Sequence, residues 1–325
     1  MTQKLFIHIG THKTATTWLQ HFLGMNADRL EDMGYYYPKT GRVNHAQHRI
    51  GQAIFQRPKS AAPIHDIPLW QRFKREIGST RYENIVISSE EFEWVHHPKV
   101  IRDFLPDVEI HVVCYLRRQD DYFESLYGQQ IRDFKPRLTV TIEEQLRKPH
   151  PYLDYKALIE RWSGAADQTH VRVFDRKFMV NGDIGQDFLS CIGLPGAEGF
   201  VQPTGAMIDH KASLSLSALE FVRHCNTLNF SEPYHNRLVN QVIRLDKLYK
   251  AVNGHKQRLL STEQRQSLLA VYENGNKAIA KQYPHVTGLS GLFAPIKNDA
   301  VKFTQTHPQS EFELLIRANG LVPIK

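Results

Sequence analysis

Short apolar runs that alternate with helical patterns constrain the fold of this chain more than any other feature. Three of them are rich in β-branched residues and cover residues 4–10 (KLFIHIG), 84–89 (NIVISS) and 109–116 (EIHVVCYL), and a fourth run at 170–175 (HVRVFD) is interrupted by an arginine. Continuous apolar runs of this length are typical of parallel strands that are buried on both faces. The sequence therefore predicts an α/β fold, an open parallel β-sheet with helices on both faces, whose ligands bind beyond the carboxyl ends of the strands.

Apolar residues at spacings of three and four predict the helices around these strands. Strand patterns fade after about residue 205, so we expect one domain in which an α/β core (1–205) carries a mostly helical C-terminal cap (206–325). A loop-rich segment at 41–68 leaves room for one short helix. The other predicted helices cover 16–23, 69–77, 99–105, 119–133, 141–148, 154–162, 213–226, 234–249 and 262–283.

The charge pattern narrows the class of ligand. The formal net charge of the 325 residues is +7. No block of consecutive Lys and Arg marks a nucleic-acid-binding tail, so the surplus of positive charge favours a small polyanion over nucleic acid as the ligand.

No apolar stretch is long enough for a membrane span, and the N-terminal apolar run is too short for a signal peptide. Cys114, Cys191 and Cys225 are widely spaced, which predicts a reducing, cytoplasmic location.

The first candidate site is the loop GTHKTATTW at residues 10–18, between the first strand and a helix. Backbone N–H groups at a strand–helix turn and the positive end of the helix dipole favour an anion. Lys13 adds a full charge, and Thr14, Thr16 and Thr17 add hydroxyl donors. The alternative is an ordinary threonine-capped helix with a solvated lysine.

The second candidate site follows the third strand, in CYLRRQDDYFESLYGQ at residues 114–129. Arg117 and Arg118 end the strand, and Ser125 lies eight residues after Arg117 on the next helix. Arginine binds phosphate in a planar, bidentate way, and a serine hydroxyl can add a hydrogen bond. The alternative is a pair of exposed arginines neutralised by the acidic residues of that helix, Asp120, Asp121 and Glu124.

The two segments together, in this order, resemble sulfotransferases that use 3′-phosphoadenosine 5′-phosphosulfate (PAPS), and the wider pattern is more similar to bacterial members. The resemblance implies a P-loop-like sulfotransferase fold with PAPS as co-substrate, bound by the core at 1–205. It implies that Lys13 contacts the 5′-phosphate and bridging oxygen, that Trp18 stacks on adenine, and that Arg117 and Ser125 hold the 3′-phosphate. Ala15 is a departure, because the family usually has glycine there. The implied PAPS-binding residues are Thr11, His12, Lys13, Thr14, Ala15, Thr16, Thr17, Trp18, Arg117 and Ser125.

Sulfuryl transfer to a hydroxyl needs a base, and ISSEEF at the end of the second strand supplies a candidate in Glu90. Several carbohydrate sulfotransferases use a glutamate in this role, and cytosolic ones use a histidine. Ser88 and Ser89 followed by acidic residues also fit a helix N-cap, and the alternatives for the base are Glu91, His45 and His48. The predicted catalytic residues are Lys13, Glu90 and His48. No metal is expected, because Lys13 and backbone dipoles can stabilise the developing charge.

Two other functions stay open at this point. A P-loop-type nucleotide kinase shares the strand–loop–helix arrangement, but it should depend on Mg²⁺ and carry lysine directly after glycine. A non-catalytic nucleotide-binding protein would keep the loop without turnover. As a sulfotransferase, the chain would act on a hydroxyl or amine of a glycan or small-molecule acceptor that the sequence does not identify. A homo-oligomer is left open.

Overall fold

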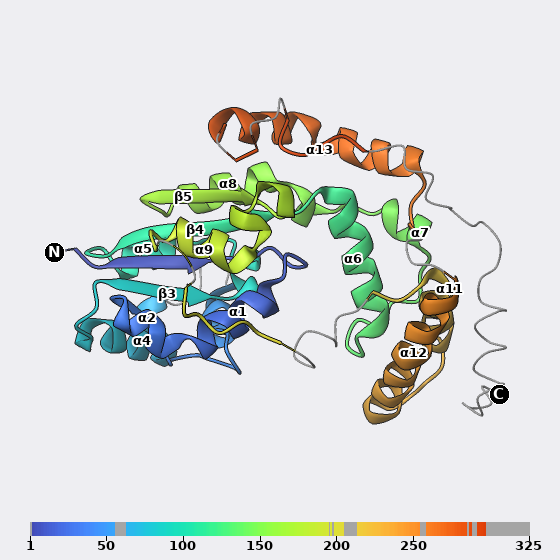
Figure 1. Cartoon of the computed structure of the whole chain (residues 1–325), viewed down its shortest axis with the longest axis horizontal. Helices are drawn as coiled ribbons and strands as arrows, with labels where there is room; N and C mark the ends of the chain where they lie inside the picture. Colours follow the sequence, from blue (N-terminus) through green and yellow to red (C-terminus); the bar gives the residue numbers. More distant parts are fainter. Residues whose placement is uncertain are drawn as a thin grey trace. The chain divides into compact units, whose positions relative to one another are not determined.

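The computed structural model describes residues 2–55, 63–194, 196, 198–204, 213–253, 258–284, 286–287 and 291–296. The chain forms two compact units, one of Met1–Arg118, Asp154–His210 and Glu273–Ala294, and one of Gln119–Leu153, Lys211–Tyr272 and Pro295–Lys325. Every strand of the sheet belongs to the first unit (Figure 1).

The first unit is built on a five-stranded sheet with the order β2-β3-β1-β4-β5, in which all neighbours are parallel. This confirms the predicted open parallel sheet. The four predicted strands are present, and among the described residues the one strand that the sequence did not predict is the two-residue edge strand β2. The strands are β1 (Lys4–His8), β2 (Tyr35–Tyr36), β3 (Asn84–Ser88), β4 (Glu109–Leu116) and β5 (Gln168–Val173).

Crossover handedness explains why helices cover both faces. The chain moves from β1 to one edge at β2, and then returns across the sheet to β3, β4 and β5. Because parallel crossovers are right-handed, the helices after β1 lie on one face and those before β3, β4 and β5 lie on the other. In the first unit these helices are α1 (Thr16–Met25), α2 (Ala27–Asp32), α3 (His48–Phe55), α4 (Pro68–Ser79), α5 (Lys99–Phe104) and α8 (Tyr155–Ser163), and a further helix, α9 (Ile184–Cys191), follows β5.

Burial follows the sequence pattern of the strands. In β1, β3 and β4 every residue after the first is buried. On one face, Phe6, Val86 and Val113 form a core cluster with the apolar side of α1 and with Phe188 of α9. The register pairs His8 at the end of β1 with Ser88 at the end of β3. The segments that follow these two strands therefore begin at the same edge of the sheet.

The other short helices described in the first unit are 3₁₀ helices of three to five residues. The one that concerns the site is η2 (Glu90–Trp94), which directly follows β3. The others are η1 (Ile64–Asp66), η4 (Arg176–Phe178) and η5 (Val180–Gly182). The sequence did not predict α2 or α9, whereas α3 matches the short helix expected within 41–68, of which residues 56–62 lie outside the described part.

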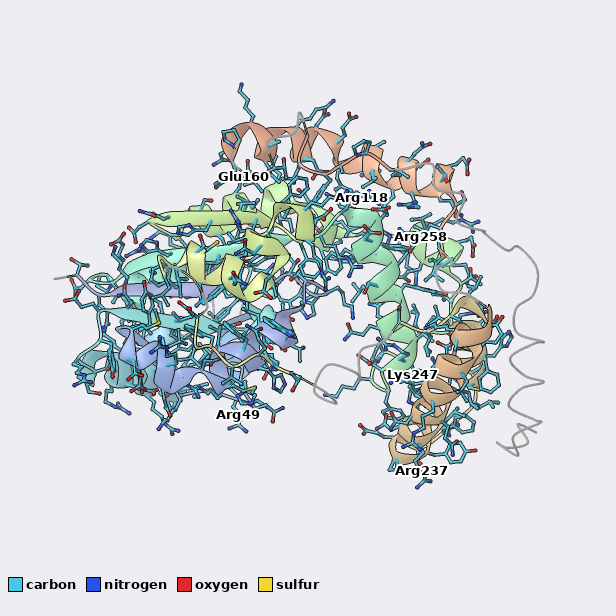
Figure 2. The ribbon with its side chains drawn as sticks, in the orientation of Figure 1. Arg49, Arg118, Glu160, Arg237, Lys247 and Arg258 are labelled. Atoms are coloured by element: carbon cyan, nitrogen blue, oxygen red, sulfur yellow. The ribbon has the colours of Figure 1, made fainter. Side chains whose placement is uncertain are left out.

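The second unit is helical, and ion pairs add to the apolar packing between its helices. Its helices are α6 (Gln119–Arg132), α7 (Ile142–Leu146), η3 (Pro151–Leu153), α11 (Leu216–Cys225) and α12 (Glu232–Asn253), and α13 (Thr262–Gln282) begins here. Arg258 (Figure 2) lies 2.7 Å from Asp121, and Arg265 lies 2.7 Å from the buried Asp120. These pairs tie the start of α6 to the segment before and within α13. Among the described residues, no helix is long and apolar enough to cross a membrane.

Candidate functional site

The loop between β1 and α1 has an unusual backbone. Gly10, Lys13 and Ala15 have φ angles of 71°, 69° and 57°. This left-handed region costs roughly 1–2 kcal/mol for a residue that carries a Cβ, and such strain often lies at functional sites. Ala15 is the N-cap of α1, its side chain makes no capping hydrogen bond, and the first turn of the helix contains no acidic residue. The helix therefore begins without a side-chain acceptor from its cap, an arrangement that suits an external anion.

Two of the loop threonines brace the loop itself. The Thr11 hydroxyl donates to the carbonyl of Tyr115 in β4 at 2.9 Å, and the Thr14 hydroxyl donates to the carbonyl of Thr11 at 2.6 Å. Both side chains are fully buried, and Thr16 is almost so, whereas Thr17 is partly exposed. In this structure the hydroxyl protons of Thr11 and Thr14 fix the shape of the loop, and their contact with a ligand stays a prediction.

Arg117 at the end of β4 reaches the same loop. Its Nη1 donates to the carbonyl of Lys13 at 2.9 Å, and its own carbonyl accepts from the Tyr155 hydroxyl at 2.5 Å. The structure thus joins the two predicted segments through Arg117 and Lys13. Ser125 lies on α6 in the other unit, so its predicted pairing with Arg117 stays a prediction.

The backbone after β3 packs directly on Gly10. A Cβ placed on Gly10 would lie 2.9 Å from the Cα of Glu90 and 3.0 Å from its Cβ. Ser89 caps the turn that follows, because its hydroxyl oxygen accepts from the Glu91 N–H at 3.2 Å. The serine cap predicted from the sequence is therefore present, and it sets Glu90 beside the loop.

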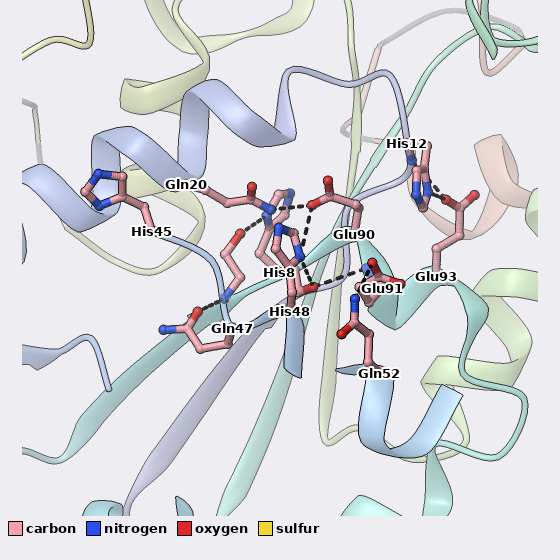
Figure 3. Close-up of polar contacts among 12 residues, drawn as sticks. His8, His12, Gln20, His45, Gln47, His48, Gln52, Glu90, Glu91 and Glu93 are labelled. Carbon is pink, nitrogen blue, oxygen red and sulfur yellow. Dashed lines mark hydrogen bonds and ion pairs between the residues drawn. The ribbon is translucent and has the colours of Figure 1, made fainter. Parts of the chain in front are cut away.

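Glu90 is the centre of a small polar cluster (Figure 3). Gln20 of α1 donates to its carboxylate at 2.5 Å, and His48 Nδ1 lies 3.9 Å from the same oxygen. His48 Nδ1 also lies 3.0 Å from the Ser89 hydroxyl. Burial opposes the charged carboxylate, but the nearby His48 and the hydrogen bond from Gln20 hold the pKa of Glu90 below its ordinary value. Glu90 is consequently ionised at neutral pH and able to accept a proton.

The other two candidate bases point elsewhere. Glu91 accepts from Gln52 of α3 at 3.0 Å and packs against Gly51. His45 (Figure 3) lies apart from Glu90, against Gly24 of α1. Its ring centroid is 4.6 Å from that of His21. The structure therefore brings Glu90 and His48 together and leaves Glu91 and His45 outside this cluster.

His12 makes a second acid–base pair at the loop. Its backbone N–H and its Nδ1 lie 2.9 Å and 2.5 Å from one carboxylate oxygen of Glu93 (Figure 3). Burial favours the neutral ring, but the hydrogen bond and charge of Glu93 outweigh it and raise the pKa of His12 above its ordinary value. Glu93 itself is almost fully buried.

Trp18 lies in the first turn of α1 and is partly exposed. Its ring stacks on Phe22 at 5.3 Å, and its edge packs on α9, where a Cβ on Gly185 would lie 3.1 Å from the ring. The predicted stacking of adenine on Trp18 stays a prediction. His8 is a buried residue of β1: its Nδ1 lies 2.7 Å from the Ser88 hydroxyl, and burial lowers its pKa to about 4.

Sequence reasoning missed Gln20 and Glu93. Gln20 is 3% exposed on the apolar side of α1. A glutamine among apolar positions of a helix must find a hydrogen-bond partner when it is buried, and this was the signal in the sequence that could have identified it. Glu93 is the third acidic residue of EEFEW, and nothing in its spacing distinguishes it from a solvated charge. Within the described part of the chain, no group of three or more His, Cys, Asp or Glu side chains is placed to hold a metal ion.

Fold and site define an α/β protein with a strained, lysine-containing loop at the carboxyl end of a parallel sheet, beside the pairs His12–Glu93 and His48–Glu90. No protein-family model matches the chain. A protein of Archaeoglobus fulgidus described as an uncharacterized protein is 26% identical over 240 residues, which are 72% of this chain. The match spans 62% of that relative's length.

One solved structure with a detectable likeness is a sulfotransferase from Alicyclobacillus acidocaldarius. It covers 70% of this chain and 94% of its own, with 17% sequence identity and a TM-score of 0.39. A likeness at this level does not identify the function of the chain, which must be argued from its own residues.

Proposed function

We propose that the protein is a PAPS-dependent sulfotransferase that moves a sulfuryl group to a hydroxyl or amine of a glycan or small-molecule acceptor. The observation that carries the proposal is the contact between the strained loop at 10–15 and the turn at Ser89 and Glu90. It sets a lysine, an uncapped helix start and an ionised carboxylate at one edge of the sheet. A group-transfer site needs a phosphate-binding element next to a proton acceptor. The lysine and the helix start would form the first, and the carboxylate would be the second.

The residues present fit a nucleotide that carries phosphates. The N–H groups at the start of α1 and the Lys13 ammonium would hold the 5′-phosphate, and Arg117 and Ser125 would hold the 3′-phosphate. PAPS, when bound, supplies the sulfuryl group for in-line transfer. Lys13 would stabilise the charge that grows on the bridging oxygen, which is the kind of interaction that accelerates transfer.

Glu90 or His48 would accept the acceptor's proton. Gln20 holds one carboxylate oxygen of Glu90, so the side chain keeps a fixed orientation toward the site. His48 Nδ1 lies 3.0 Å from the Ser89 hydroxyl, a contact that orients the ring beside Glu90. We also propose a cytoplasmic location, in keeping with the free thiols of Cys114 and Cys191.

The test is calorimetry with two nucleotides that differ by one phosphate. The desulfated product, 3′-phosphoadenosine 5′-phosphate, should bind more tightly than adenosine 5′-phosphate by about tenfold or more, as expected for a charge-assisted contact to the 3′-phosphate. Arg117→Ala should remove the preference. Arg118→Ala, at the neighbouring strand-end arginine, is the control and should keep it.

Equal affinities of the wild-type protein for the two nucleotides would contradict the proposal. The same assay with ATP separates the kinase alternative, because a kinase should bind ATP more tightly in the presence of Mg²⁺ and lose this gain with a chelator.

A further inference from the structure

His12 holds an unusual place in the loop, directly before Lys13. Two of its donors go to a single carboxylate oxygen of Glu93, one from the backbone and one from the ring. The Glu93 side chain is 3% exposed, and the Trp94 ring covers the imidazole at 5.3 Å. The ring is therefore fixed in orientation through Nδ1, as when a buried carboxylate orients a catalytic histidine.

The other ring nitrogen of His12 is left for another partner. No hydrogen bond joins Nε2 to any residue that the structure describes, and the side chain is 19% exposed. When Nδ1 is bound to a carboxylate and the ring is protonated, Nε2–H is a charged donor. The same loop carries Lys13 and ends at the start of α1, so this donor belongs to the predicted anion cradle.

Charges of both signs surround the ring. The acidic groups that act on it are Glu93, Glu90 and Glu91 of η2, and they outweigh burial and raise the pKa of His12. The basic side chains of this neighbourhood are Lys13 in the loop, Arg117, which donates to the Lys13 carbonyl, and Arg161, which donates to the Glu93 carbonyl. The acidic side prevails, so His12 keeps its proton at a higher pH than an ordinary histidine.

We propose that His12 is a second cation of the loop, held by Glu93 so that its Nε2–H donates to an oxygen of the phosphate or phosphosulfate group that Lys13 binds. The inference rests on the proposed function and adds to it a protonation-dependent contact. Binding of a phosphorylated ligand is then strong while His12 is protonated and weakens as the pH rises through the pKa of the ring.

The first experiment uses the ligand-free protein and is independent of the nucleotide. The His12 ring is titrated by NMR, and its resonance is assigned by its loss in His12→Gln. The pKa should lie above 6.5 in the wild-type protein and fall in Glu93→Gln, which keeps the shape of the side chain and removes its charge. A wild-type pKa at or below 6.5 would overturn the inference.

The second experiment measures binding of 3′-phosphoadenosine 5′-phosphate and of inorganic pyrophosphate at about pH 7 and about pH 9. Any change in the charge of the ligand over this range is the same for every variant, so the difference between variants reports on the protein. Wild-type affinity should fall by about tenfold more over this range than that of His12→Gln, as expected for the loss of a charge-assisted hydrogen bond. His96→Gln, at an exposed histidine, is the matched control and should behave like the wild-type protein.

The outcomes separate this inference from the proposed function. If the nucleotide does not bind but pyrophosphate binds with the predicted pH dependence, the nucleotide assignment fails and the role of His12 stands. If both probes bind but His12→Gln has the same pH dependence as the wild-type protein, the role of His12 is wrong and the proposed function stands. A wild-type protein that binds neither probe overturns both.

Discussion

Gly10 offers the sharpest test of how the loop and the end of β3 fit together, and Gly34 provides its control. Both glycines have positive φ angles, 71° and 84°, so alanine at either position pays the strain of the left-handed region, roughly 1–2 kcal/mol. The surroundings differ. A Cβ at Gly10 would lie 2.9 Å from the backbone of Glu90 and 3.2 Å from Thr16, whereas nothing lies within 4 Å of a Cβ at Gly34.

Gly10→Ala should therefore cost more than Gly34→Ala by the energy of forcing two backbone segments apart. Overpacking of this kind costs about 1–3 kcal/mol in addition to the strain. Urea denaturation of both variants measures the difference in the free energy of unfolding. Because the clash is with Glu90, Gly10→Ala should also weaken binding of 3′-phosphoadenosine 5′-phosphate, whereas Gly34→Ala should not. Equal destabilisation by the two substitutions would refute the close packing of the loop on Glu90.

Four further expectations can be checked with the same methods. Ala15→Gly should stabilise the protein by about 1 kcal/mol in urea denaturation, because Ala15 has a φ of 57°, and Ala53→Gly inside α3 should instead destabilise it. Between about pH 6.5 and pH 4 the unfolded chain protonates His8 while the folded protein does not, so stability should fall by about 3 kcal/mol as the pH drops through this window, and His8→Gln should lack that slope. Glu90→Gln should reduce turnover by about 10²–10⁴ with little change in nucleotide affinity, whereas Glu91→Gln, whose carboxylate faces Gln52, should stay active; the reverse result would move the base. Lys13→Ala should lower turnover by about 10²–10³, more than it weakens binding of the desulfated nucleotide, and wild-type turnover at saturating PAPS would exclude its catalytic role.

The sheet could be predicted from the sequence because of how its strands are buried. A parallel strand covered on both faces must be apolar at almost every position, and β1, β3 and β4 show such continuous runs. The edge strand β2 has two residues, too few to form a pattern. Helices α2 and α9 have six and eight residues, too few for apolar spacings of three and four to recur.

The candidate site was predictable only in part, for a different reason. Lys13 and Glu90 could be named because each lies in the segment that follows a strand, and parallel strands end at one edge of the sheet. The side-chain contacts of the site join residues that are far apart in the sequence. Gln20 and Glu90 are 70 positions apart, and His12 and Glu93 are 81 positions apart, so no local sequence pattern predicts these contacts. The choice of Glu90 and His48 over Glu91 and His45 depended likewise on the direction of side chains after a turn.

The proposed function depends most on the loop before α1, which should hold the 5′-phosphate of a nucleotide. A crystal structure with 3′-phosphoadenosine 5′-phosphate tests it directly. We predict the 5′-phosphate at the backbone N–H groups of the loop and the Lys13 ammonium, with Glu90 on the side from which an acceptor approaches. A nucleotide whose phosphates lie away from Lys13, or a loop that binds no phosphate at saturating nucleotide, would contradict the account.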